Sequence, residues 1–396
     1  MQLFIILFTL LVFVAYTGLL LYYRAAWKSI PGYPVSNIQH PASRIPQPVS
    51  ISVIIPARNE EGKLPKLLQG LAEQSYDQHL FEVIVVDDHS TDRTAEIVKQ
   101  FSSVNIKLVQ LKDHVPESGI NSYKKKAIEV AIGQSTGELI VTTDADCIVP
   151  VNWLQTIATF YKEKDPAFIV MPVCYNYQHN FLEIFQALDF MTLQGITGAS
   201  VYKKAHSMCN GANLAYTRKA FDVVEGFKGI SSIASGDDML LMHKIYKQYP
   251  QGIQYLASKE VIVQTEAMHS LKDFFNQRIR WASKADQYDD KRIFWVLLMV
   301  YSFNLLLLIM PIVTLFYNPI LSLFTIHYSL FVFWLFLLIG KTVAELFFLY
   351  PVSVFFGKQQ LLCLFPLAEP FHILYTVIAG WLGKFGSYEW KERKVK

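Results

Sequence analysis

The segment GELIVTTDAD, residues 137–146, decides how the rest of this chain is interpreted. Its apolar first half predicts a short buried strand that ends in polar residues. Side chains alternate along an extended chain, so we expect Asp144 and Asp146 to point the same way. Paired carboxylates are ligands that Mg²⁺ and Mn²⁺ prefer, with water and substrate phosphates as the remaining ligands. The segment therefore predicts a divalent cation on a nucleoside diphosphate.

An Asp-x-Asp pattern is short, and a turn in which aspartates only accept backbone hydrogen bonds is the alternative. The parts of the chain that precede this segment favour the cation site. Apolar runs at 49–56, 81–86 and 106–111 alternate with helical patterns. This βαβα order predicts a mostly parallel sheet, which binds ligands beyond the carboxyl ends of its strands.

Polar residues follow the first two predicted strands. Asn59 and Glu60 come after the first strand, and Asp87 and Asp88 come after the second. Helix capping could explain either cluster by itself. It does not explain why three successive strand ends, the third at residues 144–146, bring carboxylates to one edge. We therefore predict one shared polar site there.

Composition indicates a membrane protein. Of the 396 residues, 52% are hydrophobic and 17% are charged, which is too apolar for a wholly soluble enzyme. Residues 3–23 carry no charge and predict a membrane helix. Arg24 and Lys28 follow this run, whereas a signal peptide has its positive charges before it. The positive-inside rule then places the following domain in the cytoplasm, at the plasma or inner membrane.

Cysteines and net charge exclude several kinds of partner. The four cysteines have no metal-ligand spacing, so neither a zinc site nor a disulfide framework is indicated. The net charge of +3 comes without a basic stripe, so nucleic acid is not an expected partner.

We divide the chain into five segments: a transmembrane helix (1–23), a proline-rich linker (24–49), a cytoplasmic domain (50–290), a transmembrane region (291–384) with three or four hydrophobic segments, and a basic tail (385–396). A cytoplasmic basic tail requires an even number of spans after the domain, which favours four.

The hydrophobic segments differ in polarity. Residues 293–317 and 319–340 are uncharged and long enough to span a bilayer, whereas 342–356 is shorter. The last segment contains Glu369 and His372. Ionisable residues inside a membrane are costly, so these two side chains are either functional or paired in helix packing.

Two motifs precede the C-terminal apolar region. Asp237 and Asp238 open a helical pattern, where the helix dipole favours acids whether or not they react. The segment QRIRW places Gln277, Arg280 and Trp281 on one helix face. An arginine there can hold a diphosphate, and a tryptophan offers a flat wall to a sugar or acceptor. An amphipathic helix lying on the bilayer is the alternative for this segment.

In this order the motifs resemble those of the family 2 glycosyltransferases with a GT-A fold, in particular the membrane-integral branch with ceramide glucosyltransferase and the cellulose and hyaluronan synthases. The resemblance covers residues 50–290 and implies a Rossmann-like α/β fold with a mixed, mostly parallel sheet and flanking helices, between terminal transmembrane helices. It assigns donor-binding roles to these residues: Asn59, Glu60, Asp87 and Asp88 (nucleoside), Lys124 (near the nucleotide), Asp144 (ribose and metal) and Asp146 (metal).

For Lys124 the alternative is a solvated helix face, because Lys125 and Lys126 follow it. The resemblance also implies Asp238 as the general base, with Asp237 where the family usually has glutamate. Gln277, Arg280 and Trp281 match the Gln-x-x-Arg-Trp motif of the family. Residues 209–216 resemble its acceptor-side segment, where Gly211 suggests a close backbone approach to a ligand.

These assignments predict an inverting, membrane-bound glycosyltransferase. It would use Mg²⁺ or Mn²⁺ and move a sugar from a nucleotide-sugar, with UDP as the expected nucleotide, to a hydroxyl group of a membrane lipid. Few predicted membrane helices favour a lipid acceptor over a secreted polymer. A processive polysaccharide synthase is the first alternative, and a non-catalytic membrane protein that binds nucleotide-sugars is the second.

Overall fold

The computed structural model describes residues 2–34, 48–115, 122–178, 180–205, 208–231, 233, 236–283, 291–316, 325–386, 388–390 and 393–395. The chain forms two compact units. The sheet unit comprises Ile30–Tyr177 and Ile196–Ala267, and the helical unit comprises Met1–Ser29, Gln178–Gly195 and Met268–Lys396.

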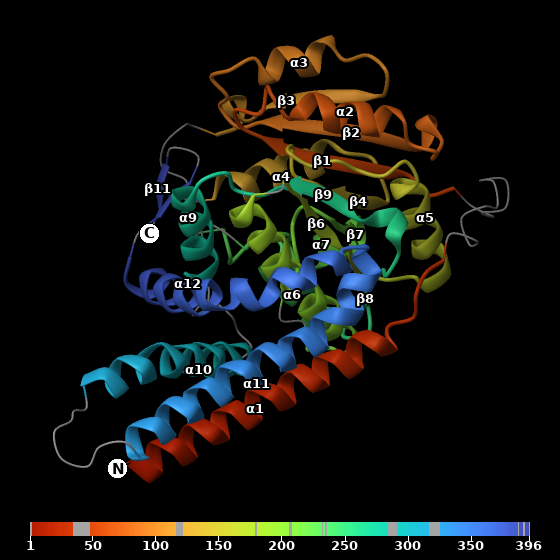
Figure 1. Ribbon diagram of the computed structural model, residues 1–396. Coiled ribbons are helices and arrows are strands. Elements are labelled where there is room, and N and C mark those ends of the chain that lie inside the picture. Colours follow the sequence, from red (N-terminus) through yellow and green to blue (C-terminus); the bar gives the residue numbers. More distant parts are fainter. Residues whose placement is uncertain are drawn as a thin grey trace. The chain divides into compact units, whose positions relative to one another are not determined.

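The sheet unit is built on a seven-stranded sheet of order β3-β2-β1-β4-β7-β5-β8 (Figure 1). Its strands are β1 (Ile51–Ala57), β2 (Phe81–Asp87), β3 (Ile106–Gln110), β4 (Leu139–Thr142), β5 (Phe168–Val170), β7 (Leu214–Thr217) and β8 (Ile253–Tyr255). β7 runs antiparallel to β4 and β5, and the other pairs are parallel. The predicted mixed, mostly parallel sheet is confirmed.

Helices connect these strands. They are α2 (Leu64–Ala72), α3 (Thr94–Gln100), α4 (Tyr123–Gln134), α5 (Trp153–Lys164), α7 (Arg218–Val223) and α8 (Met239–Gln248), and β6 (Val173–Asn176) pairs with β9 (Val263–Glu266) in a second small sheet. The leucines of α2 at 64, 67, 68 and 71 are fully buried, as the spacing of one apolar helix face requires. β1 is buried along almost its whole length, which explains its unbroken apolar run.

The order of the strands reverses at β1. The chain adds β2 and β3 on one side of β1 and then places β4 on the other side. The register pairs Ala57 with Asp87 and Ile54 with Thr142, so three strand ends share one edge. Gly137 allows β4 to begin close to β1, because a Cβ there would lie 2.5 Å from the backbone nitrogen of Ser52. Sheets of this kind bind ligands at such a reversal.

The helical unit contains α1 (Gln2–Ser29), α9 (Leu271–Ala282), α10 (Lys291–Phe316), α11 (Thr325–Phe356), α12 (Phe365–Phe385) and the first part of α6 (Phe181–Tyr202). It also contains the short strands β10 (Tyr388–Trp390) and β11 (Arg393–Val395). Helices α1, α10 and α11 lie alongside one another (Figure 1). Four described helical stretches are long and apolar enough to cross a membrane: Phe4–Ser29, Lys291–Ile312, Leu330–Phe356 and Gln359–Phe385.

The C-terminal region differs from the prediction of four spans. Stretches 319–340 and 342–356 were expected as separate segments, but α11 runs unbroken from Thr325 to Phe356. Lys341, between the two stretches, and Glu345 are both buried within this helix, and Lys341 Nζ donates to Glu345 Oε1 at 2.8 Å. The part of the chain that the structure describes therefore has three C-terminal candidates instead of four.

Candidate active site

The loops after β1 and β2 are tied together by hydrogen bonds. Asn59 Oδ1 accepts from the backbone nitrogen of Thr91 at 2.9 Å, and the backbone nitrogen of Asn59 donates to Ser90 Oγ at 3.0 Å. The backbone nitrogen of Glu60 donates to Thr94 Oγ1 at 2.8 Å. Asn59 adopts a left-handed φ of 54°, a conformation that asparagine tolerates. The Asn59 side chain thus builds the loop pair at the carboxyl edge.

Asp87 and Asp88 are both buried at this edge, with 3% and 4% exposure. Asp87 Oδ1 accepts from the backbone nitrogen of Ser90 at 3.1 Å, so one oxygen serves the turn after β2 and does not cap α3, which begins at Thr94. Asp88 Oδ1 lies 3.0 Å from His89 Nδ1. Arg58 Nη1 donates to the carbonyl oxygen of Asp88 at 3.0 Å. The acid pair is therefore held in place from several sides.

After β4 the chain forms a turn, because the backbone nitrogen of Cys147 donates to the carbonyl oxygen of Asp144 at 3.1 Å. Asp144 and Asp146 are half-buried, whereas Ala145 and Cys147 are buried, so burial alternates along the turn as expected. Burial and the charge of Asp146 raise the pKa of the Cys147 thiol. The site therefore offers carboxylate oxygens and a neutral thiol.

Each of the two aspartates has an ammonium group near it. Lys124 Nζ donates to Asp144 Oδ1 at 2.6 Å. Burial acts to lower the pKa of Lys63, but the charge of Asp146 and the ion pair with Glu266 at 3.2 Å raise it. The negative charge at this edge is therefore partly compensated by lysines of the protein itself.

Lys124 joins two of the predicted motifs. Its Nζ lies 2.6 Å from Asp144 Oδ1 and 3.3 Å from Asp237 Oδ2. Burial opposes the charged form, yet the charges of Asp144 and Asp237 raise the pKa of Lys124. Neighbouring Lys125 is buried and donates to backbone carbonyls, and Lys126 pairs with Glu129 at 2.7 Å. The solvated-face alternative is therefore wrong for Lys124.

Asp238 lies beside this group and also caps α8. Its Oδ1 accepts from the backbone nitrogen of Met239 at 2.7 Å, and its Oδ2 accepts from that of Gly211 at 3.1 Å. A Cβ at Gly211 would lie 3.1 Å from Asp237 Oδ2 and 3.2 Å from Lys124 Nζ. The residue 211 backbone thus passes directly against the charged side chains. Both readings of Asp238, cap and site residue, are compatible with this geometry.

The Gln-x-x-Arg-Trp motif lies on α9 in the helical unit. Trp281 is half-buried, and the guanidinium carbon of Arg278 stands 4.3 Å from its ring centroid. Gln277 Oε1 accepts from Arg278 Nη1 at 2.8 Å, and Arg280 is half-buried. Arg278 therefore covers one face of the Trp281 ring. That face does not form the flat wall that was expected for a sugar or acceptor. The sequence pattern did not single out Arg278, which is not a fixed position of the motif.

Protein covers part of the apolar face of α9. Phe274 is fully buried, and its ring lies 5.7 Å from that of Phe185 on α6 and 5.3 Å from that of Tyr375 on α12. Arg278 Nη2 forms a 2.7 Å ion pair with Asp189 Oδ2, and both side chains are buried. Protein therefore covers Phe274, whereas Leu271 at the start of α9 is exposed.

The sheet unit is thus a mostly parallel α/β sheet with acids and a lysine at the reversal of its strand order. The family profile described as Glycosyl transferase family 2 matches residues 52–224, and the profile described as Glycosyl transferase family group 2 matches residues 139–348. The second match covers more than half of the chain. The chain therefore belongs to the family 2 glycosyltransferases, and it has their GT-A fold.

Two relatives and one solved structure illustrate the similarity. The probable glycosyltransferase YdaM of Bacillus subtilis is 27% identical over 248 residues, which are 60% of this chain and 55% of that protein. The beta-monoglucosyldiacylglycerol synthase of Synechocystis sp. is 32% identical over 120 residues, 30% of this chain and 24% of that protein. The chain thus matches about half of the relatives' length or less.

The solved structure is the mannosyltransferase PcManGT from Pyrobaculum calidifontis in complex with GDP-Man and Mn²⁺. It has a TM-score of 0.53 and 17% identity, and the match covers 96% of this chain and 98% of that chain. At this identity the similarity establishes the fold.

Proposed function

We propose that this family 2 glycosyltransferase is a membrane-bound, inverting enzyme that moves one sugar from a UDP-sugar to a hydroxyl group of a membrane lipid. The observation that carries the proposal is the charged group at the carboxyl edge. There Lys124 contacts Asp144 and Asp237, and Gly211 brings Asp238 beside them. A nucleotide-sugar presents a diphosphate and an anomeric carbon, and this group contains residues suited to both.

Donor binding is assigned to the edge residues. Asn59, Glu60, Asp87 and Asp88 lie on the two loops that follow β1 and β2, which suits contacts with the nucleoside. The fold neighbour PcManGT was solved with a nucleotide-sugar, GDP-Man. The preference for UDP follows from the sequence resemblance. Arg280 on α9 is assigned to the leaving diphosphate, because a guanidinium binds phosphate oxygens in pairs.

A divalent cation fits the residues after β4. Asp144 and Asp146 supply half-buried carboxylate oxygens. This donor set suits Mg²⁺ or Mn²⁺ rather than a soft metal. When bound, the ion would stabilise the negative charge that develops on the diphosphate. PcManGT contains Mn²⁺.

Asp238 is assigned as the general base. Two backbone nitrogens, those of Met239 and Gly211, hold its carboxylate in one orientation. It would accept the proton of the acceptor hydroxyl while the hydroxyl oxygen attacks the anomeric carbon from the side opposite the diphosphate. The bond to the diphosphate breaks in the same displacement, so the anomeric configuration inverts. Lys124 keeps positive charge beside Asp237.

The apolar helices of the helical unit are the reason for assigning a lipid acceptor. Four described helical stretches could cross a membrane, which suits a lipid hydroxyl at the bilayer surface and a location in the plasma or inner membrane, with the sheet unit in the cytoplasm. The Synechocystis relative is named as a glucosyldiacylglycerol synthase, an enzyme of glycolipids. A processive polysaccharide synthase remains the alternative that the sequence resemblance allows.

Lipid mass spectrometry of cells with and without the gene tests this proposal. We expect one lipid class to lose a single sugar when the gene is deleted and to regain it with wild-type protein but not with Asp238→Asn. Loss of a polymer would favour the polysaccharide synthase. An unchanged set of lipids and polymers would favour a non-catalytic binding protein.

A further inference from the structure

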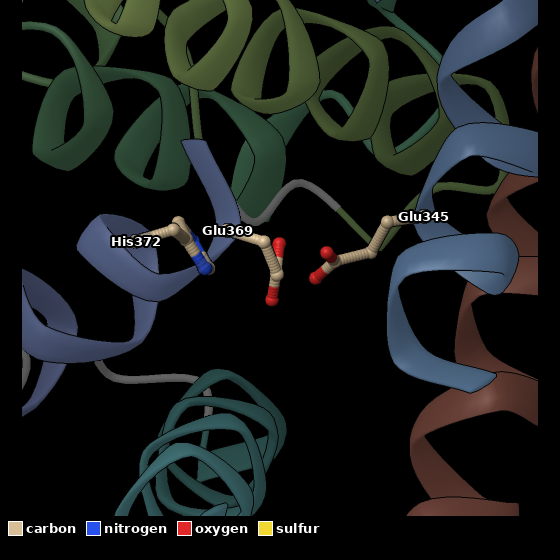
Figure 2. Close-up of side chains that lie close together, drawn as sticks. All are labelled: Glu345, Glu369 and His372. Atoms are coloured by element: carbon tan, nitrogen blue, oxygen red, sulfur yellow. The ribbon is translucent and has the colours of Figure 1, made fainter. Parts of the chain in front are cut away.

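Charged side chains meet in the interior of the helical unit. Lys341 on α11 is fully buried, and its Nζ donates to Glu345 Oε1 at 2.8 Å and to Glu369 on α12. His372 Nδ1 lies 3.3 Å from the same Nζ, and the hydroxyl of Tyr16 on α1 donates to Glu345. In Figure 2 the two carboxylates point toward one another, with His372 beside Glu369. We call these five residues the membrane cluster.

The membrane cluster contains its own cation. Ligand atoms of Glu345, Glu369 and His372 lie within 4.8 Å of one another, a spacing that a metal ion could use. The ammonium of Lys341 already bonds to both carboxylates and lies next to the imidazole. A metal ion at this point would meet a charge of the same sign. The geometry therefore favours a role in arranging the helices over a role in metal binding.

His372 connects the membrane cluster to α6. A lysine ammonium can only donate, so His372 Nδ1 accepts, and the neutral ring carries its proton on Nε2. Nε2 lies 3.9 Å from Asp189 Oδ1, which is too far for a hydrogen bond, but the His372 ring packs edge-on against the ring of Tyr375, with the centroids 5.4 Å apart. Asp189 Oδ1 accepts from the hydroxyl of Tyr375 at 2.6 Å. Contacts thus run from α11 through His372 and Tyr375 on α12 to Asp189.

Asp189 continues the chain of contacts to α9. Its Oδ2 accepts from Arg278 Nη2 at 2.7 Å. Arg278 in turn donates to Gln277 Oε1 at 2.8 Å and places its guanidinium over the ring of Trp281. Two of the three fixed residues of the Gln-x-x-Arg-Trp motif therefore contact one arginine, and Asp189 holds that arginine.

We propose that Asp189 and Arg278 are positioning residues for transfer to the lipid acceptor: they fix the side chains of Gln277 and Trp281, and the membrane cluster supports them through His372. The inference rests on the proposed function, in which Trp281 serves the acceptor. Buried ion pairs add little stability compared with apolar packing of the same volume, whereas they can impose one arrangement of the helices. The buried Asp189–Arg278 pair beside the motif is suited to holding α6 and α9 in one arrangement.

The test compares two reactions of the same purified sample: transfer of the sugar to lipid, and slow hydrolysis of the nucleotide-sugar by water. Their ratio does not depend on the fraction of folded protein. We expect Asp189→Asn and Arg278→Lys to lower the ratio about 10-fold or more, since small displacements of positioning groups have large effects on rate. Arg278→Lys keeps the charge but loses the planar group over Trp281.

Asn304→Ala is the matched control. Asn304 is also buried in the helical unit, but its Nδ2 donates to the carbonyl oxygen of Val300 within its own helix, α10. The ratio of lipid transfer to hydrolysis in Asn304→Ala should stay within about 2-fold of wild type, as expected for sites without shared partners. Tyr375→Phe removes one hydrogen bond to Asp189 and is a milder variant if Asp189→Asn does not fold. We expect a smaller decrease in the same direction.

Equal losses of transfer and hydrolysis in Arg278→Lys and Tyr375→Phe would overturn the positioning role, because they would indicate a contribution to stability alone. Wild-type protein that releases UDP but never modifies lipid would instead overturn the proposed function, and the positioning role with it. A lowered ratio in the two variants, with an unchanged ratio in Asn304→Ala, supports both.

Discussion

Two lysines of this protein occupy the same kind of position and have opposite surroundings. Lys124 lies between Asp144 and Asp237 at the edge of the sheet, where the Asp144 side chain is 36% exposed. Lys341 lies between Glu345 and Glu369, and none of these three side chains is more than 6% exposed. Each is an ammonium held by two carboxylates. Exposure therefore determines what each group can do.

At the open edge, water and ligands can replace one partner of an ion pair at little cost, so such a pair contributes little stability and can exchange its contacts. In the sealed cluster, loss of one partner leaves a buried charge without compensation. We therefore expect changes at the edge to affect turnover and changes in the membrane cluster to affect the fold. The following predictions test this difference.

The largest expected effect is on turnover at the edge. Asp146→Ala removes one of the two carboxylates after β4, so we expect metal-dependent turnover to fall to background. The stability of the protein should change by less than about 1 kcal/mol, because Asp146 is only half-buried. UDP release with and without Mn²⁺ measures the first effect, and thermal unfolding measures the second. Normal turnover with the usual metal dependence would show that the metal assignment is wrong.

Asp238→Asn separates binding from chemistry at the same edge. The amide keeps the shape of the side chain but lacks the basic oxygen, so transfer should fall by about 10²–10⁴-fold. Donor affinity, measured by calorimetric titration with the nucleotide-sugar, should remain close to that of wild type. If transfer stayed within a few-fold of wild type, the base would be a different residue, with Asp237 as the first candidate.

The two lysines can be compared directly by stability. Lys341→Met should cost about 3–5 kcal/mol, because it leaves two buried carboxylates without their cation. Lys124→Met should cost less than about 1 kcal/mol, because its partners are partly exposed. Thermal unfolding of both variants in the same detergent measures the difference. Adding Glu345→Gln to Lys341→Met should recover part of the loss, whereas equal losses in the two single variants would contradict the comparison.

The smallest expected effect concerns Trp281 on α9. Trp281→Ala should lower transfer to lipid about 10-fold more than it lowers hydrolysis of the nucleotide-sugar, since positioning losses act on the acceptor step. The ratio of the two rates in one sample measures this. Equal losses would mean that Trp281, which packs against Arg278, supports the donor or the fold instead.

The sequence was sufficient to predict the sheet and the residues at its carboxyl edge, because strand patterns and chain order depend on local residues. The apolar runs that predicted β1, β2 and β3 lie where the structure has these strands, and Asp144 and Lys124 lie together at the carboxyl edge of the sheet. Periodicity cannot predict which distant side chain neutralises a charge. The segments 319–340 and 342–356 were therefore predicted apart, although Lys341 between them lies within one helix.

Asp189 and Arg278 show the same limit. They are 89 residues apart in the chain and form a buried pair on α6 and α9. Asp189 lies in an apolar helix with no recognisable motif around it, and Arg278 occupies a variable position of one. Only packing of the helices reveals that they belong together.

The central claim is that one sugar passes from a nucleotide-sugar to a membrane lipid. The most direct measurement is mass spectrometry of the lipid product made by purified protein in bilayers with an isotope-labelled UDP-sugar and Mn²⁺. The account predicts a lipid heavier by one labelled sugar, formed with one UDP per lipid and absent with Asp146→Ala. A product carrying many sugars, or UDP release without any labelled lipid, would contradict it.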